Sequence, residues 1–394
     1  MDHALLHRAA LPVLQQPDWP DPARAQLMRH RLAAAAPLVD ARSVRALRSA
    51  LADVVAGAAI VVQAGDCAED PADRSAETVT RKAGLLDLLA GVLKLRTGRP
   101  VVRVGRIGGQ YAKPRSAPTE LVDGVLLPVY RGHLVNDPGP LLADRVPDPA
   151  RLLSCHGAAG EVLRHLGWRG LSRPHGADSP VWTSHEALLL DYEVPLVRRD
   201  ELGGNLLTST HWPWVGERTR EVGGPHVALL ADVENPVACK LGPRVSPETA
   251  VELAARLDPD REPGRLTFIA RMGADAVGDR LEPLVEAVRD AGHPAVWLCD
   301  PMHGNTVQTP SGLKTRLVTD LAREVEGFAE AVAAAGGVVG GLHLEATPDD
   351  VTECADDASG IGAVGDRYTT LCDPRLNPRQ AVALVSTWPN GRTR

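Results

Sequence analysis

The stretch CDPMHGNT at residues 299–306 follows the apolar run PAVWL at 294–298, and this pairing of a strand with a polar loop is the basis of the fold that we expect. The apolar run is typical of a short buried strand. It leads directly into a polar loop, and His303 in that loop is a side chain that can hold a divalent metal while neutral. A single histidine after a strand is more often structural, but other apolar runs in the chain end in the same way.

Eight apolar runs, with mostly helical segments between them, are predicted strands. This alternation is the pattern of an α/β protein, and eight such units predict a (β/α)8 TIM barrel with an N-terminal helical extension. The gap between the second and third runs is too long for one crossover and predicts an excursion. The runs are residues 58–63, 100–104, 180–184, 204–210, 235–240, 265–270, 294–298 and 338–345.

The expected domain organisation has two parts and no separating linker. Residues 1–57 are predicted to be a helical extension packed on the barrel, and residues 58–394 the catalytic barrel with its excursion at 117–179. Within the extension, an apolar stripe at helical spacing predicts the face that meets the barrel. The stripe consists of Val44, Leu47, Leu51 and Val54.

Composition gives no indication of a nucleic-acid or membrane partner. The net charge of the 394-residue chain is −7, and no apolar run approaches the ~20 residues of a membrane span. The N-terminus lacks the pattern of a signal peptide, and the six cysteines are scattered along the chain. We therefore expect a cytoplasmic protein that acts on small molecules, and we expect a homo-oligomer.

Polar residues follow the predicted strands, at the end of a barrel where TIM-barrel active sites lie. Loops are polar in any protein, but that explains poorly why so many titratable groups come immediately after buried strands. The ring of residues consists of Cys67, Arg106, His185, Glu217, Lys240, Arg271, His303 and Glu345.

One part of this ring predicts a metal site. The first, seventh and eighth strands are neighbours in a closed barrel, and they carry Cys67, His303 and Glu345. Asp373, just past the last strand, can add a fourth ligand. A thiolate, an imidazole and carboxylates suit Mn²⁺, Fe²⁺, Co²⁺ or Zn²⁺ better than Mg²⁺ or Ca²⁺.

The other part of the ring is cationic in a chain that is acidic overall. Only five of the 43 basic residues are lysines, and two of them, Lys113 and Lys240, fall in this group. Such a concentration predicts anionic substrates with phosphate or carboxylate groups, although each cation could instead pair with a nearby carboxylate. The group consists of Arg106, Lys113, Arg115, Arg218, Lys240 and Arg271.

Several long motifs, in order from about residue 60 to 380, resemble those of the type II 3-deoxy-D-arabino-heptulosonate 7-phosphate (DAHP) synthases. They are QAGDCAED (63–70), GRIGGQYAKPRS (105–116), SHEALLLDYE (184–193), WPWVGERTR (212–220), NPVACKLGP (235–243), RLTFIARMG (265–273), CDPMHGNT (299–306), HLE-TP--VTEC (343–354) and CDPRLN (372–377).

This resemblance implies a barrel that condenses phosphoenolpyruvate (PEP) with D-erythrose 4-phosphate in the first step of the shikimate pathway. By motif position, it assigns a metal, with Mn²⁺ or Co²⁺ expected first and Zn²⁺ or Fe²⁺ possible, to Cys67, His303, Glu345 and Asp373. It assigns PEP to Arg106, Glu217, Lys240 and Arg271, and the sugar phosphate to Lys113, Arg115, Ser116 and Arg218. The implied catalytic residues are Lys113, Glu217 and His303.

The chain departs from the family pattern in two places. The 117–180 region is shorter than in plant and mycobacterial members, which implies a compact form lacking much of the regulatory insertion. His133 and Asp137 stand where the family usually has Asp and Gly. Compact members occur in secondary-metabolite gene clusters, so an aminoDAHP synthase that uses an amino-sugar phosphate analogue is the alternative. A non-catalytic barrel that binds phospho-sugars is the alternative from another class.

Cys372 immediately precedes the proposed ligand Asp373, so its backbone is expected to lie near the metal site and near Cys67. Two such residues can meet the ~7 Å limit between Cα atoms that a disulfide requires. The sequence therefore predicts an oxidation-sensitive cysteine pair, although Cys372 could equally be a small buried residue that points away.

Overall fold

The computed structural model describes residues 11–168 and 180–390, and its parallel strands close into the expected barrel. The predictions for residues 1–10, 169–179 and 391–394, including the last part of the predicted excursion, lie outside the described residues. Around the barrel the order is β1 (Ile60–Gly65), β14 (Val338–Glu345), β11 (Val296–Cys299), β10 (Leu266–Ala270), β9 (Val237–Leu241), β8 (Trp212–Val215), β5 (Trp182–Glu186) and β2 (Val101–Arg106).

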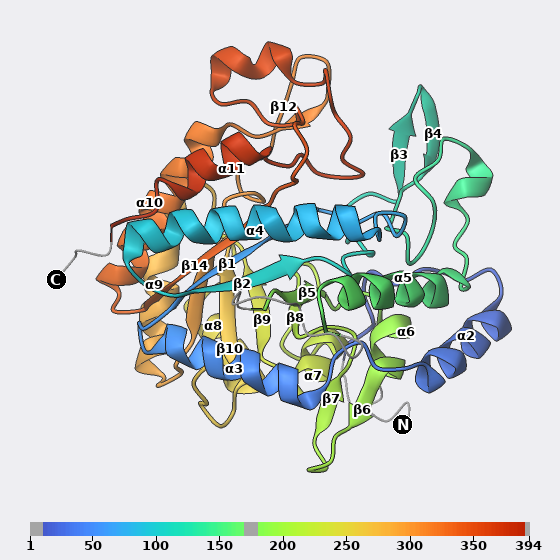
Figure 1. The fold of residues 1–394 in the computed structure, drawn as a ribbon, viewed down its shortest axis with the longest axis horizontal. Helices are drawn as coiled ribbons and strands as arrows, with labels where there is room; N and C mark the ends of the chain where they lie inside the picture. The colour runs from blue at the N-terminus through green and yellow to red at the C-terminus, as the bar shows by residue number, and fades with distance from the viewer. Residues whose placement is uncertain (1–10, 169–179, 391–394) are drawn as a thin grey trace.

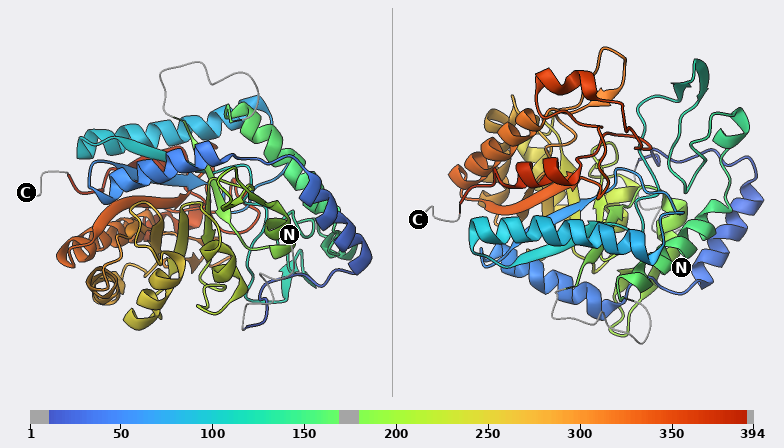
Figure 2. Two further views of the ribbon diagram at one scale, coloured as in Figure 1. Left: turned by 90° about the horizontal axis from the view of Figure 1, so that it is seen from below. Right: turned by 45° about the horizontal axis from the view of Figure 1, so that its top comes forward.

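Helices surround the strands on the outside of the barrel (Figures 1 and 2). Several begin at side chains that accept a hydrogen bond from a backbone N–H of the first turn, as Ser75 does before α4 and Ser246 before α8. The helices are α4 (Ala76–Thr97), α7 (Pro225–Ala231), α8 (Pro247–Leu257), α9 (Val277–Asp290), α10 (Val318–Ala334) and α11 (Pro378–Val385). No helix in the described ranges is long and apolar enough to cross a membrane.

One predicted strand is wrong. The run at 204–210 does not enter the barrel; its residues Asn205–Leu207 form β7, which pairs antiparallel with β6 (Val197–Arg199) in a separate hairpin. The fourth barrel strand is instead β8, which contains Pro213. A proline within an apolar run argues against a central strand because it has no N–H to donate. In β8, the buried rings of Trp212 and Trp214 override that rule by filling the barrel interior.

The glycine at the closure of the barrel is required by sterics. Gly341 of β14 has φ of +141°, and a Cβ atom there would collide with the carbonyl oxygen of Val61 on β1. The two strands pair in parallel from Val61 opposite Gly341 to Gly65 opposite Glu345. Glycine therefore permits the close approach that brings the end of β14 beside the end of β1.

The N-terminal helices α2 (Pro22–Ala34) and α3 (Ala41–Val55) pack on different parts of the molecule (Figure 1). The predicted stripe on α3 is buried, and Leu47, Leu51 and Val54 join the cluster that contains the inward-facing Trp212. Helix α3 thus covers the amino-terminal end of the barrel interior. Helix α2 packs instead against α5 (Arg151–His165) of the excursion.

The remaining described elements lie mostly in loops between the barrel strands. The excursion contains an antiparallel hairpin of β3 (Thr119–Val122) and β4 (Val125–Pro128), followed by the 3-10 helix η1 (Leu142–Arg145) and α5. A second hairpin, β12 (Val307–Gln308) with β13 (Lys314–Thr315), follows β11. The short helices are α6 (Leu190–Glu193), η2 (Val194–Leu196) and η3 (Ala358–Ala363).

We predict that Leu51→Ala lowers the free energy of unfolding by about 2–5 kcal/mol, because it leaves a cavity under the barrel. The side chain of Leu51 is 0% exposed, whereas Leu95, near the end of α4, is 88% exposed. Leu95→Ala is therefore the matched control, with an expected change within about 0.5 kcal/mol. Denaturant unfolding of both variants is the measurement, and equal effects would show that α3 does not support the barrel.

Candidate active site

A cavity of about 350 Å³ lies at the carboxyl ends of the barrel strands. Cations outnumber anions in its lining although the whole chain carries a net negative charge. The cationic residues are Lys113, Arg115, Arg218, Lys240, Arg271, Lys314 and Arg316, and the carboxylates are Glu186, Glu217 and Asp373. His303 also lines it. The arrangement suits a ligand with more than one anionic group.

Three of the four predicted metal ligands come together at one side of this cavity. The donor atoms of His303, Glu345 and Asp373 lie within 4.8 Å of one another, and His303 Nε2 is 3.3 Å from Glu345 Oε1. The Sγ atom of Cys67 is not in that group, but it accepts a hydrogen bond from the backbone N–H of Asp373 at 3.2 Å. The structure therefore brings all four side chains to one place.

The ring of His303 is oriented by Asp300, which the sequence analysis did not single out. His303 Nδ1 is 2.9 Å from the Asp300 carboxylate, which leaves Nε2 facing Glu345. Lys240 Nζ donates to the same carboxylate at 2.7 Å. Burial alone would raise the pKa of Asp300, but His303 and Lys240 hold it well below its ordinary value. One buried carboxylate thus fixes both a predicted metal ligand and a predicted substrate ligand.

The donor set fits a divalent cation. Metal-bound histidines commonly donate their second ring N–H to a carboxylate, as His303 can to Asp300. Lys113 Nζ is 3.3 Å from Asp373 and 3.7 Å from Glu345, so the Lys113 ammonium reduces the repulsion between these two carboxylates. Although burial opposes the charged form, nearby cations hold the pKa of Glu345 well below its ordinary value. Lys113 and Lys314 likewise hold the pKa of Asp373 below its ordinary value against the effect of burial, so both carboxyl groups favour the ionised form that can coordinate a cation.

The predicted cationic residues divide between the inner and outer parts of the cavity lining. Lys240 is buried at the end of β9, and Arg271 Nη2 donates to the backbone oxygen of His303 at 2.6 Å. At the exposed rim, Arg218 Nη2 donates to Ser116 Oγ at 2.6 Å. Arg115 lines the same cavity and donates to Glu120 at 2.6 Å. Residues far apart in the sequence therefore form two groups of cations.

Three residues of the predicted ring have other principal contacts. Arg106 lies beneath the cavity and does not line it; its guanidinium donates to Glu345 at 2.9 Å and to the backbone oxygen of Asp66 at 3.1 Å. His185 Nε2 is 2.8 Å from Glu193. Glu217 does line the cavity, but Arg220 and the backbone N–H of Gly242 bind its carboxylate. Each of these three side chains is thus already bound by other protein groups.

Sequence reasoning missed four polar residues at the site: Glu186, Asp300, Lys314 and Arg316. Glu186 Oε1 is buried with no partner among the described residues, and burial raises the pKa of this carboxyl despite nearby Lys240. Lys314 Nζ is 2.8 Å from Asp373, and Arg316 Nη2 is 2.9 Å from Glu345. Glu186 and Asp300 stand in motifs already quoted, one directly after His185 and one three residues before His303. Lys314 is one of only five lysines in the chain, and this rarity could have marked it as a candidate site residue.

The two residues that differ from the family pattern, His133 and Asp137, lie outside the cavity. His133 is buried, with Nε2 3.9 Å from Asp70, and Asp137 pairs with Arg151 at 3.1 Å. Neither residue lines the space between the cationic residues.

The predicted cysteine pair lies side by side. Burial raises the pKa of the Cys67 thiol, but a hydrogen bond with Cys372 and the charge of Lys113 outweigh it and bring the value to about 7. Arg115 Nη1 is 3.3 Å from Cys372 Sγ. Both cysteines are free thiols.

The chain is similar to known proteins over most of its length. Residues 6–175 and 161–387 match the class-II DAHP synthetase family. A probable phospho-2-dehydro-3-deoxyheptonate aldolase of Pseudomonas fluorescens is 55% identical over 379 residues, covering 95% of this chain and 94% of that protein. The corresponding aldolase of Streptomyces coelicolor is 40% identical over 423 residues, covering 95% of this chain and 94% of its own. The latter alignment is longer than this 394-residue chain, so that relative carries segments with no counterpart here.

A solved structure shares the fold. The phospho-2-dehydro-3-deoxyheptonate aldolase of Francisella tularensis superimposes with a TM-score of 0.56 over 95% of this chain and 97% of that one, at 13% sequence identity. At that identity the likeness concerns the fold alone.

We predict that Asp300→Asn weakens Mn²⁺ binding by about 10–100-fold, because the amide orients His303 less firmly and leaves Lys240 without its counter-charge. Isothermal titration of the metal-stripped protein with Mn²⁺ is the measurement. The matched control is Asp290→Asn, whose side chain is 67% exposed outside the site. Equal affinities of the two variants, both folded by circular dichroism, would rule out the orienting role of Asp300.

We also predict that chelated protein forms a Cys67–Cys372 disulfide under mild oxidant. The thiolate is the reactive form, and the low pKa of Cys67 supplies it near neutral pH. Peptide mapping after alkylation of the remaining thiols checks this, with buried Cys354 as the internal control. Recovery of both Cys67 and Cys372 as alkylated free thiols would contradict the prediction.

Proposed function

Because this chain belongs to the class-II DAHP synthetase family, we propose that its barrel condenses PEP with D-erythrose 4-phosphate. Enzymes of this family are 3-deoxy-7-phosphoheptulonate synthases. The reaction consumes one water molecule, whose oxygen adds to C2 of PEP as the phosphate leaves, and the products are DAHP and inorganic phosphate. The observation that carries this proposal is the division of one cavity into a cluster of potential metal ligands and two groups of cations. Two phosphorylated substrates that repel each other need such a cationic cavity to meet.

The proposed metal residues are Cys67, His303, Glu345 and Asp373. A divalent metal held there, with Mn²⁺ or Co²⁺ expected first, would act as a Lewis acid on the aldehyde group of the sugar phosphate. The chain's contribution is to keep these ligands deprotonated and oriented. Asp300 orients His303, and Arg316 binds the second carboxylate oxygen of Glu345 at 2.9 Å.

The proposed PEP site is built on Lys240 and Arg271, which line the inner part of the cavity. Burial lowers the pKa of Lys240, and the Asp300 carboxylate opposes that shift. Such an ammonium, held at one point, can pair with a phosphate or carboxylate oxygen. In this proposal Arg106 supports Glu345 from below, and a direct contact with PEP would require it to exchange one of its present bonds.

The proposed sugar-phosphate site is the rim formed by Arg115, Ser116 and Arg218. The Arg218 guanidinium already donates to an oxygen, Ser116 Oγ, at 2.6 Å. Lys113 lies between this rim and the metal ligands, within 3.3 Å of Asp373. From there its ammonium can contact both substrates and bring C3 of PEP to the aldehyde carbon. Such positioning can supply about 7–11 kcal/mol of the barrier.

The reaction also needs a group that can hold a proton, because the aldehyde oxygen gains one as the carbon–carbon bond forms. Of the two glutamates in the lining, Glu217 is bound by Arg220 and Gly242. Glu186 has an unpartnered oxygen within the described structure and a pKa raised by burial. We propose that Glu186 takes this role in preference to Glu217, the residue that the motif match favoured.

The two alternatives have less support. The residues that suggested an amino-sugar substrate, His133 and Asp137, do not line the cavity, so nothing in its lining favours that substrate. A non-catalytic phospho-sugar-binding barrel would need the cations, but it would have no need of the imidazole and two carboxylates that converge beside them. Erythrose 4-phosphate is therefore the second substrate that we propose.

The test is phosphate release from PEP in the presence of erythrose 4-phosphate. We expect turnover to stop with a chelator and to return with Mn²⁺ or Co²⁺. We expect Lys240→Ala and Arg271→Ala each to lower kcat/KM for PEP by an amount equivalent to ~2–4 kcal/mol, because each removes a charged hydrogen bond.

The control for these variants is Lys94→Ala, which removes an exposed lysine of α4 outside the cavity. Unchanged kinetics in both cavity variants would refute the proposed PEP site. Full activity of His303→Ala after exhaustive chelation would refute the metal assignment. Faster turnover of an amino-sugar phosphate analogue than of erythrose 4-phosphate would favour the alternative substrate.

A further inference from the structure

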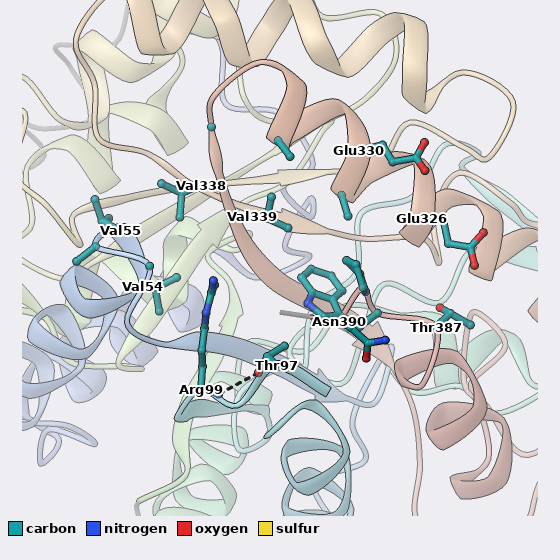
Figure 3. Close-up of a pocket in the computed structure, with 17 residues that line it drawn as sticks. Val54, Val55, Thr97, Arg99, Glu326, Glu330, Val338, Val339, Thr387 and Asn390 are labelled. Atoms are coloured by element: carbon teal, nitrogen blue, oxygen red, sulfur yellow. Dashed lines mark hydrogen bonds between the residues drawn. The ribbon is translucent and has the colours of Figure 1, made fainter. Parts of the chain in front are cut away.

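A second cavity, of about 540 Å³, lies at the amino-terminal end of the barrel and is larger than the active-site cavity. The end of α3, the residues after α4, helix α10 and the start of β14 surround it (Figure 3). Val338 and Val339 at the start of β14 are among its walls, whereas Glu345 ends the same strand at the active site. The length of the strand separates the two sites by roughly 23 Å. The volume is in the range of small-molecule sites.

The walls of this cavity are largely apolar. Val54 and Val55 of α3 and the two valines of β14 surround the space in Figure 3. The ring of Trp388, which is only 2% exposed, adds a flat apolar surface. These side chains can cover an aromatic ring or a branched aliphatic group of a ligand.

One cation stands in this apolar space. The side chain of Arg99 extends among the valines in Figure 3, and its backbone N–H donates to Thr97 Oγ1 at 3.2 Å. Within the described parts of the chain, no carboxylate or carbonyl accepts from its guanidinium. The neighbouring Arg96, by contrast, donates to the backbone oxygen of Trp388 at 3.0 Å. An unpartnered guanidinium facing an apolar cavity is complementary to a carboxylate.

The rim restricts the charge of the ligand. Glu326 and Glu330 on α10 line the cavity and are exposed (Figure 3). Two carboxylates beside a single guanidinium disfavour a ligand with several negative charges, such as a phosphate ester. They tolerate a single carboxylate that is held at Arg99. The rim thus distinguishes this cavity from the active site, where cations predominate.

We propose that this cavity binds a small apolar monocarboxylate, with its carboxylate on Arg99 and its apolar body against Val54, Val339 and Trp388. The guanidinium can hold both carboxylate oxygens through parallel N–H···O hydrogen bonds. The site needs neither PEP nor the metal, so the inference does not depend on the proposed function.

The probe for this proposal is 3-phenylpropionate, with the neutral 3-phenylpropionamide as its isostere. We expect saturation-transfer NMR and calorimetric titration to show binding of the carboxylate to the full chain, and binding of the amide about 10–100-fold weaker, because the amide lacks the charge-assisted hydrogen bonds. Excess PEP should not displace the probe. Equal affinity for acid and amide, or displacement by PEP, would overturn the proposal.

Two variants, with a third as control, test whether the probe binds in this cavity. Arg99→Gln should weaken binding of the acid to the level of the amide, while Arg280→Gln, which removes an exposed arginine of α9 outside the cavity, should not. Ala333→Leu adds volume from the exposed side of α10 and should abolish binding of both probes. Equal binding by the Arg99 and Arg280 variants would overturn the proposal. A change of oligomeric state on size-exclusion chromatography in the Arg99 or Ala333 variant would show that the cavity is an interface between copies, which would also overturn it.

Unchanged thermal unfolding and unchanged phosphate release from PEP by the Arg99 variant would show that the protein remains folded. Since the probe is detected by NMR, its binding can fail while catalysis succeeds, and catalysis can fail while the probe still binds. The two proposals are therefore tested separately.

Discussion

The buried carboxylate of Glu345 is the constraint on which the catalytic end of the barrel depends. The residue is 0% exposed, and a carboxylate removed from water is very unfavourable unless charge and hydrogen bonds compensate for it. Arg106 from β2 and Arg316 from the segment after β13 each donate to it at 2.9 Å, and His303 from the loop after β11 lies 3.3 Å away. The need to satisfy one carboxylate thus ties together three separate parts of the chain. In the same way, Asp300 binds both Lys240 and His303, so the residues proposed for PEP and for the metal cannot shift independently.

The support for this network comes from the barrel interior and from the last loops of the chain. His343 of β14 is 2.8 Å from Arg106 through Nε2 and 2.6 Å from Gln63 of β1 through Nδ1. Burial and nearby cations hold the pKa of His343 well below its ordinary value, so the ring is neutral, accepts a hydrogen bond from Arg106 and donates one to Gln63. On the outer side, Arg375 donates hydrogen bonds to Asp66 at 2.6 Å and to Glu353 at 2.7 Å. Asp66 directly precedes Cys67, and Arg375 lies two residues after Asp373. The proposed metal ligands are therefore held by buried polar groups that have few conformations open to them.

The barrel was predictable because parallel strands buried on both faces are short apolar runs, and helices with a polar outer face separate them. That reasoning identified seven of the eight barrel strands, and it failed at the fourth. There, residues 204–210 have the composition of a strand, while Trp212–Val215 contain a proline. The free-energy cost of placing Pro213 in a central strand is small compared with the gain from burying two tryptophan rings inside the barrel. No local pattern reports that balance, because the interior that the rings fill does not exist until the barrel has closed.

The fold class, the end of the barrel that holds the candidate site and most of the residues gathered there could be predicted from the sequence alone, because a side chain that follows a buried parallel strand can only lie at that end. The motif match added the proposed roles. Only the tertiary structure decided which of those side chains face the cavity and which stand beneath it. Arg106 and Arg271 both follow barrel strands, yet Arg106 is used to neutralise Glu345 while Arg271 lines the cavity. The same holds for Lys314 and Arg316, which reach Asp373 and Glu345 from a hairpin after β11. The reason is physical: the partner of a buried charge is set by distance in the folded chain, and distance along the sequence carries almost no information about it.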